Sequence, residues 1–415
     1  MSHILNTPNF TDEMKKDYKI LIPDMLPIHF AMLQKLFRNF GYDCEVLKNE
    51  GKSVVDTGLM YVHNDTCYPA LMVIGQMIDA LNSGKYDLSK TALMITQTGG
   101  GCRASNYIKL LKKALHKAGY GDIPVLSLNF AGLDKDSSMK FTPEMLVSAA
   151  LIITCGDMIT LVSNQTRPYE INKGDTDKLI NEWIEKINLM IDDGVKISSV
   201  KGIFKRIAKS FSEIPMDRTR KTVKVGVVGE IYVKYSSVAN NRLEEFLASE
   251  GCEVMVPGLL GFCYYCIVNW VEDYNNYGGK YSSHLIFKFA ETLVAKCEDM
   301  MINALKPYDC FTAPTSLPEI KRLAEEIIGI GCKMGEGWLL VGEMMGLIED
   351  GYENIVCAQP FGCLPNHIVG KGVIRKIRNK YSDANIVPID YDPGATKVNQ
   401  ENRIKLMLSI AREKL

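Results

Sequence analysis

The chain carries one structural pattern twice, and this internal duplication limits the folds that it can adopt. The first copy runs from Cys67 through the helical stretch LMVIGQMIDAL and the apolar stretch TALMIT to a glycine run and Cys102. The second runs from Cys332 through WLLVGEMMGLI and NIVCAQPFG to Cys363. Two thiol pairs are thereby placed at equivalent positions of two lobes, which is the arrangement that a soft metal centre between lobes requires.

The duplication extends beyond the cysteines. Residues 19–47 and 223–256 both read as an apolar strand, an amphipathic helix, a glycine stop and a second strand. Further helices follow the second cysteine of each pair, and then apolar strands at 123–129 and 384–392. Strands that alternate with helices favour a parallel sheet covered on both faces. We therefore expect an α/β protein of two parallel-sheet lobes related by internal duplication, with helical connecting segments.

Length and periodicity divide the chain into three parts. At 415 residues, 47% of them hydrophobic, it can bury two or three cores. We expect a first lobe at 1–141, a helical connecting region at 142–221, and a second lobe at 222–415 with a helical insertion at about 259–306. Because no Pro-rich or low-complexity linker separates the lobes, we expect them to be docked closely.

Charge and cysteine content narrow the class of protein. Charged residues make up 23% of the chain and the net charge is −1. We therefore do not expect the positive electrostatic potential that attracts nucleic acid, and nucleic acid is not an expected partner. The beginning of the sequence lacks a signal-like segment, and an uninterrupted apolar run of roughly 18 residues is not found, so we expect a cytoplasmic protein without a membrane partner. Twelve cysteines in such a chain favour metal ligation or redox chemistry over disulfides.

Cys102 and Cys363 are expected where a strand gives way to a helix. Ligands of open parallel sheets gather at the carboxyl ends of the strands. Glycines beside both cysteines let the backbone approach a bulky group, and a helix N-terminus favours the thiolate. The alternative is a glycine-rich phosphate loop in which Cys102 is incidental. Neither GxxxxGK[ST] nor GxGxxG supports that alternative.

Four further cysteines are candidates for the same centre. Cys67 and Cys332 occupy matched places at the start of a helix. Cys357 lies within or just after a strand and can point into the core or the cleft. Cys155 ends the apolar run AALIIT and is expected at the end of an element.

The other cysteines are more simply explained by packing. Cys263 and Cys266 form a C-x-x-C, which could be half a zinc site or a redox pair. No second C-x-x-C completes a zinc quartet, and the surrounding segment is aromatic and helical, so packing is favoured. The same interpretation applies to Cys44, Cys252, Cys297 and Cys310.

Polar residues near the expected cleft are candidates for proton transfer or for lining the centre. The catalytic candidates are Glu336, Glu343 and His367, and the residues expected to line the cysteine loops are Gln97, Gly99, Gly100, Gly101 and Gln359. Other polar residues of these loops are His63, Asn64, Asp65, Asn106, Glu230, Lys234 and Asn366. Such residues are usually caps and turn formers. Neither HExxH nor G-x-S-x-G occurs, so a zinc or serine hydrolase is not expected.

Several strings in the chain resemble one family. NDTCYPALMVIGQ, TQTGGGCRASNY, RPYE, VGEIYVKYSSVANN, GEGW, QPFGCLPNH and VNQENRIKLML resemble the 2-hydroxyacyl-CoA dehydratase-like proteins related to CoA enzyme activases. This group includes the double-cubane cluster proteins, and the resemblance covers about 19–411. It implies Rossmann-like lobes that hold oxygen-sensitive iron–sulfur clusters on cysteine thiolates. It also implies a separate ATP-hydrolysing activator with its own [4Fe-4S] cluster, supplied in trans, and a homodimer.

The resemblance also implies a ligand set. By motif, Cys67, Cys102, Cys357 and Cys363 are carried over, whereas Cys155 and Cys332 depart from many relatives. These six would supply the three thiolates that each half of an [8Fe-9S] double cubane needs.

The expected function is accordingly that of an iron–sulfur reductase component. It would accept low-potential electrons and reduce a small substrate at a cysteine-bound cluster in the interlobe cleft. The enzyme alternative is a 2-hydroxyacyl-CoA dehydratase subunit that uses a [4Fe-4S] cluster and ketyl-radical chemistry. The non-enzyme alternative is a two-lobed ligand-binding protein whose cysteines are merely buried.

Overall fold

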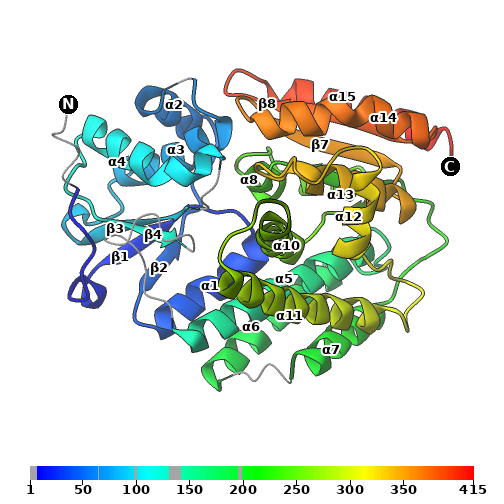
Figure 1. The fold of residues 1–415 in the computed structure, drawn as a ribbon, viewed down its shortest axis with the longest axis horizontal. Helices are drawn as coiled ribbons and strands as arrows, with labels where there is room; N and C mark the ends of the chain where they lie inside the picture. The colour runs from blue at the N-terminus through cyan, green and yellow to red at the C-terminus, as the bar shows by residue number, and fades with distance from the viewer. Residues whose placement is uncertain (1–6, 64, 98–100, 130–141, 195–198) are drawn as a thin grey trace.

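The computed structural model describes residues 7–63, 65–97, 101–129, 142–194 and 199–415. Within them the chain forms two four-stranded sheets with the orders β2-β1-β3-β4 and β6-β5-β7-β8, and all strand pairs are parallel (Figure 1). The expected α/β class with two parallel-sheet lobes is confirmed. The identical strand order of the two sheets is what an internal duplication predicts.

The first lobe surrounds the sheet of β1 to β4. Its strands are β1 (Lys19–Ile22), β2 (Asp43–Val46), β3 (Thr91–Gln97) and β4 (Val125–Asn129). Its helices are α1 (Pro27–Asn39), α2 (Lys52–Tyr61), α3 (Tyr68–Asn82) and α4 (Tyr107–Ala118), with short 3₁₀ helices at Met14–Lys16, Leu88–Lys90 and Arg103–Asn106. Ile20 and Leu21 point to opposite faces of β1 and both are fully buried, so helices cover this central strand on both sides.

The second lobe repeats this plan. Its strands are β5 (Lys224–Gly229), β6 (Glu253–Met255), β7 (Asn354–Pro360) and β8 (Asn385–Tyr391). Around them lie α8 (Ile231–Tyr235), α9 (Leu243–Ser249), α12 (Leu317–Glu325), α13 (Gly337–Glu349), the π-helix Asn366–Lys371, α14 (Gly372–Lys380) and α15 (Lys397–Arg412). Between β6 and β7 the chain adds α10 (Leu259–Tyr277) and α11 (Tyr281–Leu305), at the place of the expected insertion.

Matched glycines show how closely the two lobes correspond. Gly75 of α3 and Gly342 of α13 occupy the same place in the repeat. A Cβ added at Gly75 would collide with the carbonyl oxygen of Val54 in α2, and one at Gly342 would collide with that of Ile320 in α12. In each lobe a glycine therefore permits the close crossing of two helices.

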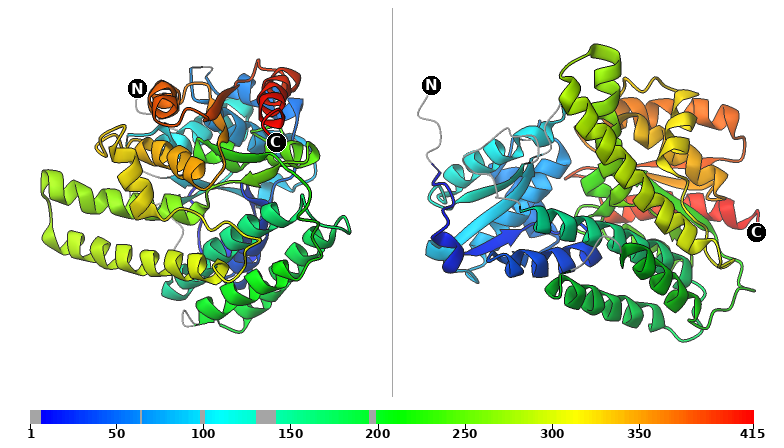
Figure 2. Two further views of the ribbon diagram at one scale, coloured as in Figure 1. Left: turned by 90° about the vertical axis from the view of Figure 1, so that its right-hand side faces the viewer. Right: turned by 60° about the horizontal axis from the view of Figure 1, so that its bottom comes forward.

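Three helices connect the lobes, namely α5 (Pro143–Thr166), α6 (Asp175–Asp192) and α7 (Val200–Ser212). Thr142 caps α5 by accepting a hydrogen bond from the Met145 amide, and Pro143 takes the first helical position. Helix α5 packs against α1 of the first lobe and against β6 and α10 of the second (Figure 2). It is long and apolar enough to cross a bilayer, but 67% of its most apolar window is buried within the protein, which makes it weak evidence for a membrane span.

Candidate metal centre

The loops that carry three of the predicted ligands adjoin one another where the lobes meet. Cys67 is the N-cap residue of α3, Cys102 precedes the 3₁₀ helix that follows β3, and Cys363 lies in the turn after β7. The amide of Tyr68 donates to the carbonyl of Phe361 at 2.9 Å. These positions confirm that Cys102 and Cys363 follow strands at the carboxyl ends of the two sheets.

A close backbone contact joins the Cys67 and Cys363 segments. Gly362 has a φ of +73°, and a Cβ added there would lie 3.0 Å from the Cα of Cys67. Both the left-handed conformation and the contact therefore require glycine at this position. The thiol of Cys363 is thus carried on a turn that rests on the Cys67 turn.

Cys102 belongs to the same group of side chains. The Sγ of Cys67 lies 3.1 Å from the hydroxyl of Tyr107, which begins the helix after Cys102. Burial, followed by negative charge at Glu336, Glu230 and Cys67, raises the pKa of the Cys102 thiol to about 11. The adjacent Gly101 faces Met334 of the second lobe, because a Cβ added at Gly101 would lie 2.5 Å from the Met334 sulfur.

Two carboxyl groups adjoin the three thiols. Glu336 accepts hydrogen bonds from the Ile231 amide at 2.9 Å and from the Asn366 side chain at 3.2 Å. The same Asn366 nitrogen lies 3.3 Å from the Sγ of Cys363 and donates to it. Glu230 caps α8 by accepting from the Val233 amide at 2.9 Å. Burial, followed by the charge of Glu336, raises the pKa of Glu230 to about 8.

The electrostatic setting keeps the free thiols protonated. Burial raises the pKa of Cys363 strongly, and the charges of Glu336 and Glu230 add to this. Burial also raises the pKa of Cys67, although the Tyr107 hydroxyl opposes the shift. A bound group that carries positive metal ions would reverse this balance, because metal coordination deprotonates a thiol.

The donor groups beside the three cysteine loops limit what the site can hold. Among the described residues, no group of three or more His, Cys, Asp or Glu side chains could hold a single metal ion. In a cubane each thiolate binds a different iron, so its cysteines stand farther apart than the ligands of one ion. Buried Oε1 of Gln359 and Oδ1 of Asn366 lack hydrogen-bond partners within the described chain, as expected beside a site that receives a polar group. Thiols on adjoining loops and these two unpartnered oxygens are the donor chemistry that a thiolate-bound group uses.

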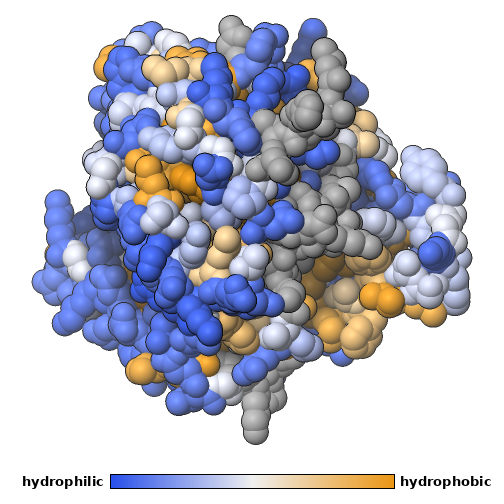
Figure 3. Space-filling view, turned by 90° about the vertical axis from the view of Figure 1, so that its left-hand side faces the viewer, coloured by the Kyte–Doolittle hydropathy of each residue, from blue (hydrophilic) through white to orange (hydrophobic). Residues whose placement is uncertain are grey.

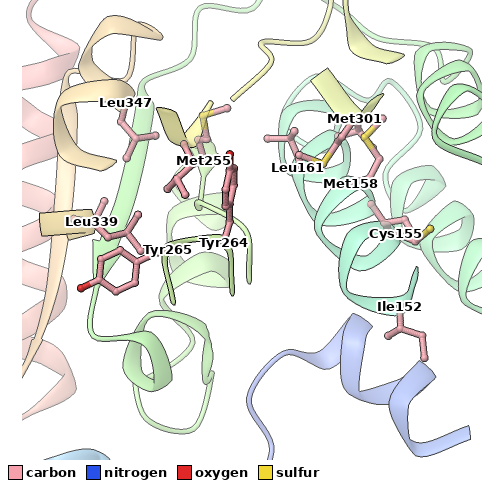
Figure 4. Packing of buried hydrophobic residues seen from close by; sticks show 14 of the residues in the cluster. Ile152, Cys155, Met158, Leu161, Met255, Tyr264, Tyr265, Met301, Leu339 and Leu347 are labelled. Atoms are coloured by element: carbon pink, nitrogen blue, oxygen red, sulfur yellow. The ribbon is translucent and has the colours of Figure 1, made fainter. Parts of the chain in front are cut away.

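Cys155 and Cys357 are not brought to this group. Cys155 lies in the middle of α5, fully buried among apolar residues that include Met158 and Leu161 (Figure 4). The expectation that it ends an element is wrong, because the apolar helix continues to Thr166. Cys357 is an interior residue of β7, fully buried, and a Cβ added at Gly370 would lie 3.5 Å from its sulfur. Both thiols thus fill core space.

Cys332 lies beside the three thiols but not at a helix start. It occupies the exposed turn that precedes α13, and its carbonyl accepts from the Trp338 amide at 2.7 Å. The same turn carries Met334 and Glu336, which adjoin Gly101 and Asn366 respectively. Cys332 is therefore near the centre in position while its side chain is open to solvent.

The C-x-x-C of α10 faces the same region, which the sequence interpretation missed. Cys266 is exposed and Cys263 is half-buried one turn before it, so the packing explanation is wrong for Cys266. Between them Tyr265 donates its hydroxyl to the Lys333 carbonyl at 2.8 Å, which ties α10 to the Cys332 turn. Burial, followed by the charge of Glu336, raises the pKa of Cys266 to about 12.

Some of the predicted polar residues hydrogen-bond to the cysteine loops, and others lie beside these loops without contacting a cysteine. Gln97 donates to the Ser105 carbonyl at 2.8 Å and so braces the Cys102 loop. Gln359 and the Nδ1 of His367 are 2.5 Å apart, beside the Cys363 turn. Glu343 forms an ion pair with Lys234 at 3.3 Å, and both side chains are 3% exposed. We therefore assign Glu343 a role in the stability of the fold. Gly101 lies against Met334, whereas Gly99, Gly100 and Asn64 lie outside the described residues.

Comparison with known proteins gave no assignment. No family model matches the sequence, and no curated protein matches it. Two pockets of about 290 and 310 Å³ lie on the second lobe, one beside Trp338 and one beside Asn385, and neither is lined by a cysteine. The proposal below therefore depends on the cysteine geometry.

Proposed function

We propose that Cys67, Cys102 and Cys363 bind an iron–sulfur cubane between the lobes, and that the protein is a reductase component acting on a small substrate. The observation that carries this proposal is the meeting of three thiols from three loops of both lobes, at the carboxyl ends of two parallel sheets. In the proposed function a separate ATP-hydrolysing iron–sulfur protein supplies the electrons. When bound, the cluster would supply one-electron transfer at low potential.

The surrounding side chains have defined parts in this proposal. The Asn366 amide and the Tyr107 hydroxyl hydrogen-bond to the sulfurs of Cys363 and Cys67. Hydrogen bonds to ligating sulfur withdraw charge from it and raise the reduction potential. Glu336 orients Asn366 and also holds the first amide of α8, so it positions one ligand through another residue. Glu230, half-buried beside Glu336, is the carboxyl placed to hold a proton near the sulfurs.

A second set of thiols supports a double-cubane form of the centre. Because Cys155 and Cys357 fill core space, the six ligands cannot be those suggested by the resemblance without rearrangement of the core. We propose Cys263, Cys266 and Cys332 as the second set, on the basis of the Tyr265 to Lys333 contact that joins their segments. The dehydratase alternative needs only the first set.

Cysteine variants test the two sets separately. Iron content, visible absorption and EPR spectra are measured on anaerobically purified Cys102→Ser, Cys363→Ser and Cys266→Ser. Cys252→Ser, a fully buried thiol of the second lobe, is the control for lost packing. We expect the first two variants to lose the cluster signal and the control to keep it. Loss in Cys266→Ser of about half the iron would support the second set, whereas full iron in Cys102→Ser and Cys363→Ser would contradict the proposal.

A further inference from the structure

A cavity of about 290 Å³ lies where the hairpin of α10 and α11 meets α12 and α13, and we call it the hairpin cavity. The hairpin stands out from the second lobe (Figure 2) and projects to the right in Figure 3. Leu317, Lys321 and Glu325 line the cavity from α12 at a spacing of four residues, so one face of that helix forms a wall. Tyr264 and Val268 line it from α10 at the same spacing.

Much of the inner surface of the hairpin cavity is apolar and fixed in place. Trp338, Leu317 and Val268 line it, and all three are buried. The Nε1 of Trp338 donates to the Asn269 side chain at 3.0 Å, and its ring packs edge-on against Tyr265 with centroids 4.8 Å apart. Sites for small molecules are mostly preformed apolar cavities of about 300–1,000 Å³ with a few polar groups. The hairpin cavity lies at the lower end of this range and therefore fits a compact ligand with a hydrocarbon body.

One hydroxyl of the hairpin cavity lacks a partner. Tyr264 is 3% exposed and lines the cavity, yet its hydroxyl forms no hydrogen bond with the residues that the structure describes. The next residue, Tyr265, leaves α10 in a different direction (Figure 4), and its hydroxyl donates to the Lys333 carbonyl at 2.8 Å. A buried tyrosine hydroxyl is normally hydrogen-bonded. The hydroxyl of Tyr264 is therefore available to a ligand.

The two cationic side chains of the hairpin cavity are already paired. Lys321 forms an ion pair with Glu272 at 2.7 Å. Arg322 pairs with Glu319 at 2.6 Å and with Glu326 at 2.8 Å. An anionic ligand would have to compete with these carboxylates for both cations.

The charge that remains in the hairpin cavity is negative. Glu291 lines the cavity, and its partner Lys288 is 57% exposed, so water screens that ion pair. Glu325 also lines the cavity and has no ion pair among the described residues. Burial, followed by the charges of Glu298 and Glu291, raises the pKa of Tyr264 to about 12. The potential beside the free hydroxyl therefore favours a cation.

We propose that the hairpin cavity binds a small organic amine. The ammonium group would donate to Glu291 and to the Tyr264 hydroxyl, while the hydrocarbon body packs against Trp338 and Leu317. An ammonium ion beside an aromatic ring gains a further cation–π attraction. This inference concerns a second binding site and does not depend on the proposed cluster.

The test is the affinity of the full chain for three probes of similar size, measured by isothermal titration calorimetry under anaerobic conditions. The probes are phenethylamine, which is a cation at neutral pH, the uncharged phenethyl alcohol, and the anion phenylacetate. The amine is expected to bind at one site per chain, roughly 10–100-fold tighter than the alcohol, as a charge-assisted hydrogen bond provides. Phenylacetate is expected to bind most weakly.

Variants locate the binding. Glu291→Gln should weaken amine binding roughly 10–100-fold and leave alcohol binding unchanged. The matched control is Glu182→Gln, because Glu182 forms a similar helical ion pair with Lys186 on α6 and does not line the cavity. The control should bind the amine like the wild type. Tyr264→Phe removes only the free hydroxyl and should also weaken amine binding, which covers the case in which Glu291→Gln perturbs folding.

Circular dichroism and iron content are recorded on the same samples, so that loss of the amine site is distinguished from loss of the fold or of the cluster. Equal affinity for the amine and the alcohol, or tighter binding of phenylacetate, would overturn the proposal. So would the absence of amine binding at millimolar concentration, or unchanged amine affinity in folded Glu291→Gln and Tyr264→Phe variants.

Discussion

Gly362→Ala probes the contact that holds the Cys363 turn against the Cys67 turn. The added Cβ would lie 3.0 Å from the Cys67 Cα, which is tighter than normal packing, and the φ of +73° is left-handed. The conformational cost alone is about 1–2 kcal/mol of unfolding free energy. The backbone contact adds an overpacking cost of about 1–3 kcal/mol unless the two turns separate. Separation would move one sulfur from the others.

Gly351→Ala supplies the matched control for this experiment. Its φ is +87°, so the conformational cost is similar, but a Cβ there has no atom within 4 Å. Gly351→Ala should lose about 1–2 kcal/mol in chemical denaturation, and Gly362→Ala should lose at least as much. Only Gly362→Ala should lose bound iron after anaerobic reconstitution. If the two variants load iron equally well, the contact between the turns does not position the ligands, and the reasoning is refuted.

Three further predictions concern buried charged groups. Glu343→Ala should cost about 3–5 kcal/mol of unfolding free energy because it leaves buried Lys234 unpaired. The double variant Lys234→Met with Glu343→Leu should recover much of this stability. An equal loss of stability in the double variant would contradict the prediction. Asp157→Ala should cost about 3 kcal/mol because its carboxylate accepts from the amides of Leu259 and Leu260 and contacts His29. Amide exchange should become faster at the start of α10, and unchanged exchange there would argue against the cap. Burial raises the pKa of Glu298 from 4.5 to about 7, so the folded state holds this proton more tightly than the unfolded state. The protonated Glu298 stabilises the folded state fully below about pH 4.5. As the pH rises to about 7 this stabilisation is lost, and the free energy of unfolding falls by up to about 3 kcal/mol. Glu298→Gln should flatten that part of the stability profile measured by denaturation, and an unchanged slope would exclude Glu298 as its source.

The repeated pattern was sufficient to predict the sheets because it specifies both element type and order. Apolar runs separated by amphipathic helices permit little other than parallel strands, and the structure has them in the same order in each lobe. The glycine beside Cys363 was expected to let the backbone approach a bound group, whereas the structure places it against the backbone of Cys67. The positions of Cys102 and Cys363 followed from the rule that ligands lie at the carboxyl ends of strands.

The direction of the other thiols could not be predicted in this way. In β7 the residues on both faces are buried, so no alternation shows whether Cys357 points to the core or the cleft. In α5 the apolar residues surround the helix, which hides both its length and the orientation of Cys155. Cys266 had a usable signal in its C-x-x-C spacing. Its aromatic neighbours outweighed that signal, because a helical segment rich in Tyr and Trp is normally packed.

Iron and acid-labile sulfide per chain, measured on anaerobically purified and reconstituted protein, test the central claim most directly. The account predicts at least about four irons with matching sulfide per chain, and about eight if Cys263, Cys266 and Cys332 bind a second cubane. Reduction should change the EPR spectrum of the same sample. A folded chain that binds no iron after reconstitution would contradict the account, and would leave a two-lobed binding protein whose thiols are protonated and buried.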